Sequence, residues 1–188
     1  KMIGRSITVL DEMLKTRAET GKNIRGVVLE ARELGQTGAV EPVSLDLHAG
    51  EVVGLAGLVG SGRTEFVSLL FGSQKPDSGT LTVGGNNVDD FSPGASIARG
   101  IALCPEDRKA EGIVGDLTVR ENIILALQSN QGWFKFLSRE KQNEIADRYI
   151  QLLEIATPST EQPVKNLSGG NQQKVILARW LATNPQVL

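Results

Sequence analysis

Apolar and polar residues alternate along residues 43–55, and a fully apolar run overlaps the end of this stretch. The segment VSLDLHAGEVVGL predicts two strands joined by a turn at residues 48–50, which begins with the single histidine, His48. Residues 52–56 are apolar throughout, which is typical of a strand buried on both faces. The pattern therefore predicts two consecutive strands, the second of them buried.

Three later segments also have strand character. Residues 75–85, KPDSGTLTVGG, predict a turn followed by an edge strand. Residues 100–107, GIALCPED, predict another buried strand that ends at Pro105, with Cys104 as a buried thiol. The final residues, NPQVL, resemble the opening of one more strand. A single cysteine excludes an internal disulfide and a cysteine-rich zinc site.

Helical periodicity appears in other parts of the chain. Residues 64–72, TEFVSLLFG, predict a short helix that Gly72 closes. From about Leu117 to Ala156 the pattern is helical, with Ser138 as a candidate N-cap and an end at Thr157-Pro158. The apolar residues that recur at helical spacing in its second part are Ile145, Tyr149, Leu152, Leu153 and Ala156.

Two further segments complete the pattern. A helix is predicted to begin near Ser168 and to reach Leu181. The first twenty or so residues are charged and compatible with a helix, and they end in a Gly-Lys-Asn break. We interpret residues 1–23 as a linker or as the tail of a preceding unit.

A glycine-rich loop, GLVGSGRTE, lies between the apolar run and the short helix. A strand, a glycine loop and a helix in this order form the context of a phosphate-binding P-loop, G-x-x-x-x-G-K-S/T. Backbone N–H groups converge in such a loop and meet the negative charge of a phosphate chain. Gly60 and Gly62 let the backbone approach closely, and Thr64 would offer its hydroxyl to Mg²⁺.

Two residues depart from this pattern. Arg63 occupies the lysine position, and its longer, planar, forked group is not a conservative replacement for a compact charge. Glu65 lies in the first turn of the helix, where its carboxylate could repel a phosphate or could simply stabilise the helix dipole. By itself this loop leaves nucleotide binding open.

Composition limits the alternatives. The net charge of −2 provides no overall basic field that would favour nucleic acid. Apolar residues make up 40% and charged residues 22%, as in an ordinary globular domain, and no apolar run approaches the length of a membrane span. His48, in a predicted turn, is expected to be a surface residue.

The segment LSGGNQQKV, residues 167–175, is the second motif. Two glycines follow a candidate Ser N-cap at the start of a strong helix, which forms a second anion-binding helix terminus or an ordinary capped helix. This string resembles the signature motif of ABC-transporter ATPases. Together with GLVGSGRTE, PEDRKAEGIV and LTVRENI, it makes nearly the whole chain resemble the C-terminal half of a duplicated ATPase from bacterial sugar importers of the ribose, galactose and xylose type.

That resemblance implies an α/β fold: a P-loop NTPase of the ABC ATPase type with a RecA-like core, an antiparallel β subdomain and an inserted α-helical subdomain. It implies a β subdomain and P-loop part of the core at 24–115, the helical subdomain at 116–166, and the signature region at 167–188. The segments CPEDRK, VRENIILALQ and TPSTEQP are most similar to the galactofuranose-importer ATPase.

The resemblance also implies how the site works. In such proteins two ATPase halves enclose two ATP molecules, and each site joins the P-loop of one half to the signature motif of the other. The implied cofactors are ATP and Mg²⁺, with Thr64 as the metal ligand. The implied nucleotide-binding residues are Gly57, Gly60, Ser61, Gly62, Arg63, Thr64, Glu65, Leu167, Ser168, Gly169, Gly170, Asn171 and Gln172.

Two further positions depart from the family's pattern. Glu106 falls where the family has the Q-loop glutamine, and no Phe, Tyr or Trp precedes Phe66 to stack on adenine. We therefore expect a degenerate P-loop and an intact signature motif, apart from Asn171 before Gln172. The chain ends before the Walker B and switch residues of the family, so we expect no catalytic residue within it and no hydrolysis by it alone.

The implied partners are a second ATPase half, membrane permease subunits and, indirectly, a sugar-binding protein, at the cytoplasmic face of a bacterial membrane. Three alternatives stay open. A soluble ABC ATPase acting on DNA or ribosomes predicts basic patches or inserted arms, and a P-loop kinase needs the lysine. A non-catalytic nucleotide-sensing module fits the altered P-loop. The aromatic segment GWFKFL, residues 132–137, indicates either a partner contact or core packing.

Overall fold

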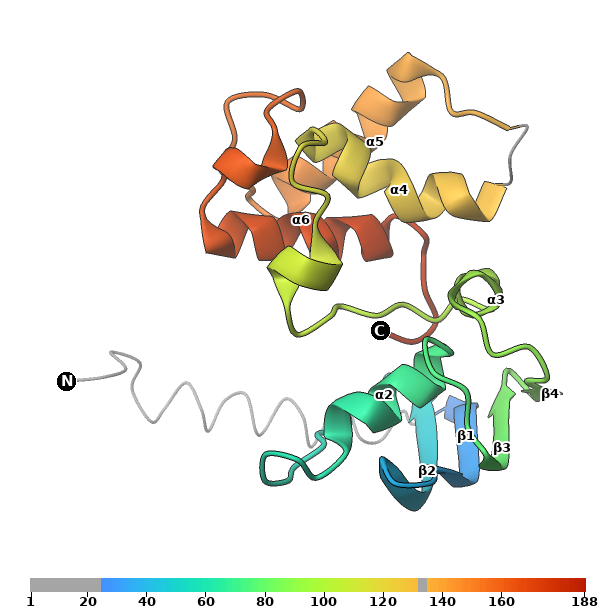
Figure 1. Ribbon diagram of the computed structural model, residues 1–188. Helices are drawn as coiled ribbons and strands as arrows, with labels where there is room; N and C mark the ends of the chain where they lie inside the picture. The colour runs from blue at the N-terminus through green and yellow to red at the C-terminus, as the bar shows by residue number, and fades with distance from the viewer. Residues whose placement is uncertain (1–24, 132–134) are drawn as a thin grey trace, which may run out of the picture. The chain divides into compact units, whose positions relative to one another are not determined.

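The computed structural model describes residues 25–131 and 135–188, which divide into two compact units (Figure 1). The strand unit contains the described residues up to Arg63 together with Asp77–Val88. The helical unit contains Thr64–Pro76 together with Asp89–Leu188. The predicted linker at 1–23 and the aromatic residues Trp133 and Phe134 lie outside the described residues, whereas Phe136 is 79% exposed.

The strand unit is built on a four-stranded antiparallel sheet. Its strands are β1 (Arg25–Gln36), β2 (Val40–Ala49), β3 (Ser78–Val83) and β4 (Asn86–Asn87), in the order β2-β1-β3-β4. Leu29 of β1 pairs with Leu47 on one side and with Val83 on the other. Because side chains alternate between the two faces of a strand, Leu29 and Ala31 are buried together with Leu81 and Val83.

A bulge in β1 shifts the alternation. The register of β1 changes between Ala31 and Leu34 against β2, and Glu33 there has a φ of 46°. Gly79 of β3 lies opposite, with a φ of 81°, and a Cβ on it would stand 2.2 Å from the Glu33 carbonyl oxygen. Glycine is required at this position because both the backbone angle and the close approach exclude a side chain.

The predictions for the strand unit hold only in part. Residues 43–49 form a strand, but His48 belongs to β2 and the turn follows at Gly50, with a φ of 82°. The buried strand at 52–56 was wrong: residues 51–58 belong to no strand or helix, and Val52 is 82% exposed. An apolar run becomes a buried strand only when ladder partners flank it, and no described strand pairs with this one. The predicted edge strand is β3, which has the two-residue β4 outside it.

The strand predicted at residues 100–107 is reduced to one bridge. Ile101 pairs in parallel with Val187 from the final residues, and Ile101 and Ala102 are buried. Burial ends there, so Cys104 is exposed, and its prediction as a buried thiol was wrong.

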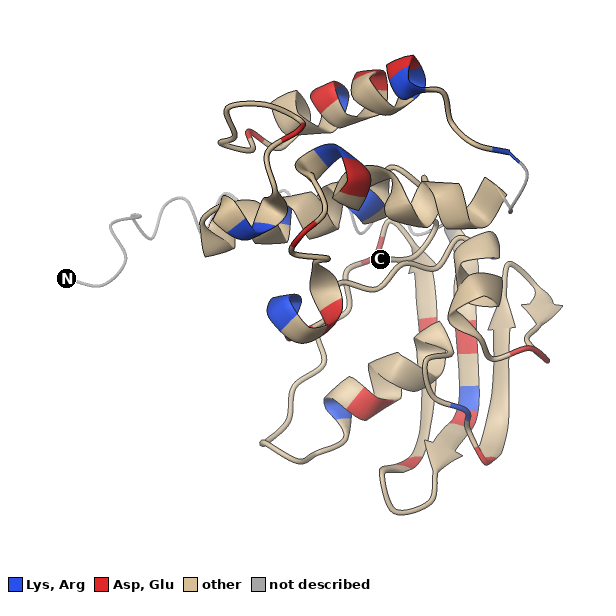
Figure 2. Ribbon diagram, turned by 45° about the horizontal axis from the view of Figure 1, so that its top comes forward, with Lys and Arg blue, Asp and Glu red and all other residues tan. Residues whose placement is uncertain are grey.

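The helical unit gathers around one apolar core. Its elements are α2 (Arg63–Phe71), which enters it from the strand unit, α3 (Pro93–Ala98), the short π-helix η2 (Arg108–Gly112), α4 (Val119–Gln131), α5 (Arg139–Leu152), the 3-10 turn η3 (Val164–Asn166) and α6 (Gly169–Leu181). Helices α4, α5 and α6 share this core, which contains Val119, Ile123, Ala146, Ile155, Val164, Val175 and Ala178. Figure 2 shows acidic and basic residues mixed along α5 rather than separated.

Most predicted helices are confirmed. Helix α2 ends at Phe71 before Gly72, whose φ is 73°, and Ser138 caps α5 by accepting a hydrogen bond from the Lys141 N–H. The predicted end at Thr157-Pro158 was wrong, because α5 stops at Leu152 and Glu154 takes a left-handed φ of 50°. Leu152 and Ala156 are exposed, whereas Ile145, Tyr149 and Leu153 pack on the apolar core.

A buried polar network fastens α6 to α4. The Arg179 guanidinium is 7% exposed and donates to the Asn122 carbonyl at 2.8 Å, to Asn122 Oδ1 at 2.8 Å and to the Gly112 carbonyl at 2.6 Å. The Asn122 side-chain amide in turn donates to the carbonyls of Val114, Leu117 and Thr118. Burial lowers the pKa of the Arg179 guanidinium. A buried cation of this kind depends on every one of its acceptors.

Replacing Asn122→Ala is expected to destabilise the chain by about 3 kcal/mol, because it removes the side-chain oxygen that accepts from the Arg179 guanidinium and from the Val114 N–H in a buried site. Urea unfolding measures the change. Asn143→Ala is the matched control: its buried Oδ1 has no hydrogen-bond partner among the described residues, so the loss should stay below about 1 kcal/mol. Equal losses in the two variants would contradict this account of the network.

Candidate functional site

The glycine loop predicted from the sequence is a tight turn in the strand unit. Gly60 and Gly62 have φ angles of 80° and 79°, which residues with side chains rarely adopt. A Cβ on Gly57 would lie 2.3 Å from Ser61 Oγ, and one on Gly62 would lie 2.9 Å from the Ala39 carbonyl oxygen. The backbone path therefore requires glycine at 60 and 62, whereas Gly57 leaves room for the Ser61 side chain.

The loop leads into the first turn of α2, which begins with Arg63, Thr64 and Glu65. The first N–H groups of a helix have no partner within it and attract anions. Glu65 is an acidic residue in this first turn, as predicted. A carboxylate at this end interacts favourably with the helix dipole and competes with any anion that approaches.

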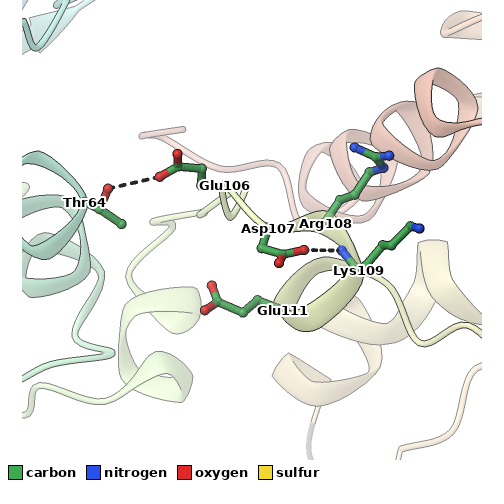
Figure 3. A pocket seen from close by; sticks show the side chains of 6 residues that line it. All are labelled: Thr64, Glu106, Asp107, Arg108, Lys109 and Glu111. Atoms are coloured by element: carbon green, nitrogen blue, oxygen red, sulfur yellow. Dashed lines mark hydrogen bonds between the residues drawn. The ribbon is translucent and has the colours of Figure 1, made fainter. Parts of the chain in front are cut away.

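Within the helical unit, Thr64 pairs with Glu106, the residue predicted at the Q-loop position. The Thr64 hydroxyl donates to Glu106 Oε2 at 3.1 Å (Figure 3). Hydroxyl and carboxylate oxygens are the ligands that Mg²⁺ prefers, so this pair fits a cation of that kind. No group of three or more His, Cys, Asp or Glu in the described part of the chain could hold a metal. A magnesium ion here would take its other ligands from water or from phosphates.

Both residues line a hollow of about 600 Å³ whose other walls come from the segment after Pro105. The lining residues are Thr64, Glu106, Asp107, Arg108, Lys109 and Glu111. Asp107 begins η2 by accepting hydrogen bonds from the N–H groups of Lys109 and Ala110, and these bonds lower the pKa of its carboxyl. The carboxylates and the two cations give the hollow a mixed charge.

The second motif forms the start of α6. Ser168 stands at the N-cap position, Gly169 and Gly170 open the helix, and the Gln172 N–H donates to the Ser168 carbonyl at 2.9 Å. Gln172 is buried, and its amide group donates to the Val164 carbonyl at 3.3 Å. Leu167 packs against the apolar core of the helical unit. Leu167 before the loop and Gln172 after it are thus held in place by packing and hydrogen bonds, while Ser168 and Gly170 are exposed.

Arg108 is a site residue that the sequence did not single out. Its Nε donates to Gln172 Oε1 at 3.4 Å, and a Cβ on Gly169 would stand 2.9 Å from its guanidinium Nη2. Two residues earlier in the chain, Glu106 binds Thr64. The short segment 106–108 therefore contacts α2 through Glu106 and α6 through Arg108. The string CPEDRK marked this segment as part of the family resemblance. Its pattern does not indicate the direction of the Arg108 side chain.

A family model described as ABC transporter matches residues 40–188. The chain belongs to the ABC transporter family. The fructose import ATP-binding protein FruK of Bifidobacterium longum is 46% identical over 189 residues, which cover all of this chain and 37% of that protein. The galactofuranose transporter ATP-binding protein YtfR of Escherichia coli strain K12 is 53% identical over 157 residues, which cover 84% of this chain and 31% of that protein. The chain thus spans about a third of the length of these curated relatives.

Solved structures confirm the predicted fold class. A dimeric, post-hydrolysis ATP-binding cassette bound to ADP and Pi aligns with a TM-score of 0.69 at 24% identity, over 84% of this chain and 70% of that one. A nucleotide-free cassette from an ABC transporter aligns with a TM-score of 0.69 at 21% identity, over 85% of this chain and 66% of that one. These ABC family members share the P-loop NTPase fold of the chain. Among the described helices, none has the length and apolar character needed to cross a membrane.

Replacing Gly169→Ala is expected to change the melting temperature by less than about 2 °C, because the added methyl meets only the tip of the flexible Arg108 side chain. Gly112→Ala is the contrasting variant: its Cβ would stand 2.5 Å from Cδ1 of the buried Ile176, and overpacking of this kind costs about 1–3 kcal/mol. Thermal unfolding of both variants tests this. A large loss in Gly169→Ala would show that Arg108 cannot move aside.

Proposed function

We propose that this chain is the ATP-binding, energy-coupling domain of an ABC importer for a monosaccharide. The observation that carries the proposal is the 46% identity to a fructose import ATP-binding protein over the full length of the chain. Relatives that import ribose and arabinose, at 44% and 42% identity, support the same substrate class.

The proposed nucleotide site at the chain's own P-loop binds Mg²⁺-ATP weakly. Arg63 replaces the lysine, and two carboxylates stand where phosphate and metal would approach: Glu65 in the first turn of α2, and Glu106 against Thr64. Each adds negative charge near a polyanion. No aromatic residue precedes Phe66 to stack on a base. The loop glycines support binding of phosphate, and these four features weaken it.

In contrast to the weak P-loop, the signature loop, residues 168–170, is proposed to bind phosphate strongly. Ser168, Gly169 and Gly170 contact the γ-phosphate of an ATP molecule that is held by the P-loop of a second ATPase half. In support, Ser168 and Gly170 are exposed, and the charged side chain nearest to Gly169 is a guanidinium rather than a carboxylate. Hydrolysis then occurs at the site that this loop completes, with residues that the described chain does not supply.

Further partners follow from the substrate class: membrane permease subunits that take up the energy, and indirectly a sugar-binding protein, at the cytoplasmic face of the membrane. The alternative of an ATPase acting on nucleic acid predicts basic patches, whereas basic and acidic residues are mixed along α5 (Figure 2). The alternative of a non-catalytic nucleotide sensor is favoured by Arg63 and Glu65, and it predicts that the signature loop is dispensable.

The affinity of the P-loop for nucleotide tests the proposed weak site. Isothermal calorimetry on this chain is expected to give a Kd for Mg²⁺-ATP weaker than about 1 µM, the level worth roughly 8 kcal/mol. The double variant Arg63→Lys with Glu65→Thr should bind more tightly, because it restores a compact charge and removes a repulsive one. The two positions are neighbours, so their effects need not add. Glu111→Thr, which removes an acid from the hollow but not from the P-loop, is the control. Unaltered affinity in the double variant would place the weakness elsewhere.

In the full-length transporter, the P-loop and the signature motif of this chain are expected to contribute unequally to ATPase activity. Gly169→Asp should lower sugar-stimulated ATPase activity by roughly 10²–10³-fold, because it places bulk and negative charge where developing charge on phosphate must be stabilised. Arg63→Ala should lower it only several-fold, since its site turns over little. Gly169→Ala separates bulk from charge. Steady-state ATPase assays in membranes that contain the permease and the binding protein measure all three. Equal loss in Gly169→Asp and Arg63→Ala would rule out unequal sites.

A further inference from the structure

The serine of the signature loop does not cap its own helix. Ser138 and Ser92 accept a backbone N–H from the first turn of their helices, as N-cap serines do. Ser168 has N-cap backbone angles, a φ of −62° and a ψ of 156°, but its side chain accepts no backbone N–H. Over the described residues, no hydrogen bond uses the N–H groups of Gly169, Gly170 or Asn171. The first turn of α6 therefore keeps its donors, and the Ser168 hydroxyl is engaged by another group.

That group is the side-chain amide of Asn171. Its Oδ1 accepts the Ala156 N–H at 2.9 Å, and its Nδ2 donates to Ser168 Oγ at 3.0 Å. A backbone N–H can only donate, so it must face the amide oxygen, and the amide nitrogen must then face the serine. The contact with Ala156 thus fixes the orientation of the amide, which the shape of the side chain alone would leave ambiguous.

A serine that accepts a hydrogen bond keeps its own proton free to donate. No acceptor for the Ser168 hydroxyl proton occurs among the hydrogen bonds of the described chain. The oxygens of a phosphate that carry its charge are acceptors and need donors around them. With the three free N–H groups and one hydroxyl proton, the start of α6 offers four hydrogen-bond donors.

We propose that Asn171 is a positioning residue that orients the Ser168 hydroxyl so that its proton points to the γ-phosphate. The inference rests on the proposed function, in which Ser168 contacts that phosphate. Asn171 does not touch the nucleotide in this arrangement. Its amide is held by the Ala156 N–H, in the loop after α5, and in turn orients the serine hydroxyl at the start of α6.

A purely structural role for Asn171 would be to tie that loop to α6, and the chain contains a matched control for it. Lys174, one turn further along α6, donates from Nζ to the Glu154 carbonyl at 2.8 Å. It therefore links the same helix to the same loop without touching Ser168. If tying the loop is what matters, the loss of either link should have a similar effect.

The test is steady-state ATPase activity of the full-length protein with its permease in membranes, with ATP as the varied substrate. Ser168→Ala is expected to lower kcat roughly 10²-fold. Asn171→Ala should lower kcat roughly tenfold and change KM for ATP less than about twofold, since one oriented hydrogen bond is worth about that much. In the Ser168→Ala background, Asn171→Ala should add less than about a twofold further loss, because both act through one hydroxyl. Lys174→Met should stay within about twofold of the unaltered protein.

Asn171→Asp keeps an acceptor for the Ala156 N–H, so the fold is retained, and its carboxylate accepts the serine proton instead of donating. Its kcat should fall at least as far as that of Ser168→Ala. Melting temperatures of all variants identify any that fail to fold. Additive losses in the double variant, equal losses in Lys174→Met and Asn171→Ala, or full activity in Asn171→Asp would each overturn the inference. An unchanged rate in Ser168→Ala would overturn the proposed role of the signature loop, and the inference with it.

Discussion

A buried guanidinium without a carboxylate partner holds the helical unit together. Arg179 is surrounded by two carbonyls and the Asn122 amide oxygen, all neutral groups. Its acceptors come from α4 and from Gly112, at the end of η2. The position of η2 is thereby tied to α6, and η2 contributes the Arg108 side chain that lies against Gly169. The geometry of the signature loop therefore depends on a network about three turns away on the same helix.

Local signals in the sequence were sufficient for α2 and α6, for the helical region that contains α4 and α5, and for the two glycine motifs, but not for α3. Helix caps depend on the type of a single residue. The N-cap at Ser138, the helix end at Gly72 and the start of α6 near Ser168 could therefore be predicted. The end of α5 could not, because it depends on Glu154 adopting a left-handed angle, which propensity does not reveal. The strands were harder. An apolar run such as residues 52–56 indicates that a segment is able to be buried. Burial also requires neighbouring strands, which a local pattern does not reveal.

The candidate site also has features that depend on single residues and features that depend on distant partners. Residue type alone indicated that Gly57, Gly60 and Gly62 would form a tight loop and that Glu65 would lie in a first helical turn. It indicated neither the pairing of Thr64 with Glu106 nor the approach of Arg108 to Gly169. Those contacts join residues more than 40 positions apart, and their side-chain directions follow from the path of the backbone after Pro105. Sequence predicted which residues carry the chemistry, and the fold determined which of them meet.

The two motifs differ in the polarity of the hydrogen-bonding groups around them. At the start of α2 the hydroxyl of Thr64 donates to Glu106, so its proton is already used and a carboxylate lies beside it. At the signature helix the hydroxyl of Ser168 accepts from Asn171, so its proton remains available. A hydroxyl can serve either purpose, and its neighbour decides which one. In the proposed function this contrast adds to Arg63, Glu65 and the missing aromatic residue as a reason to expect weak phosphate binding at the P-loop and strong binding at the signature motif.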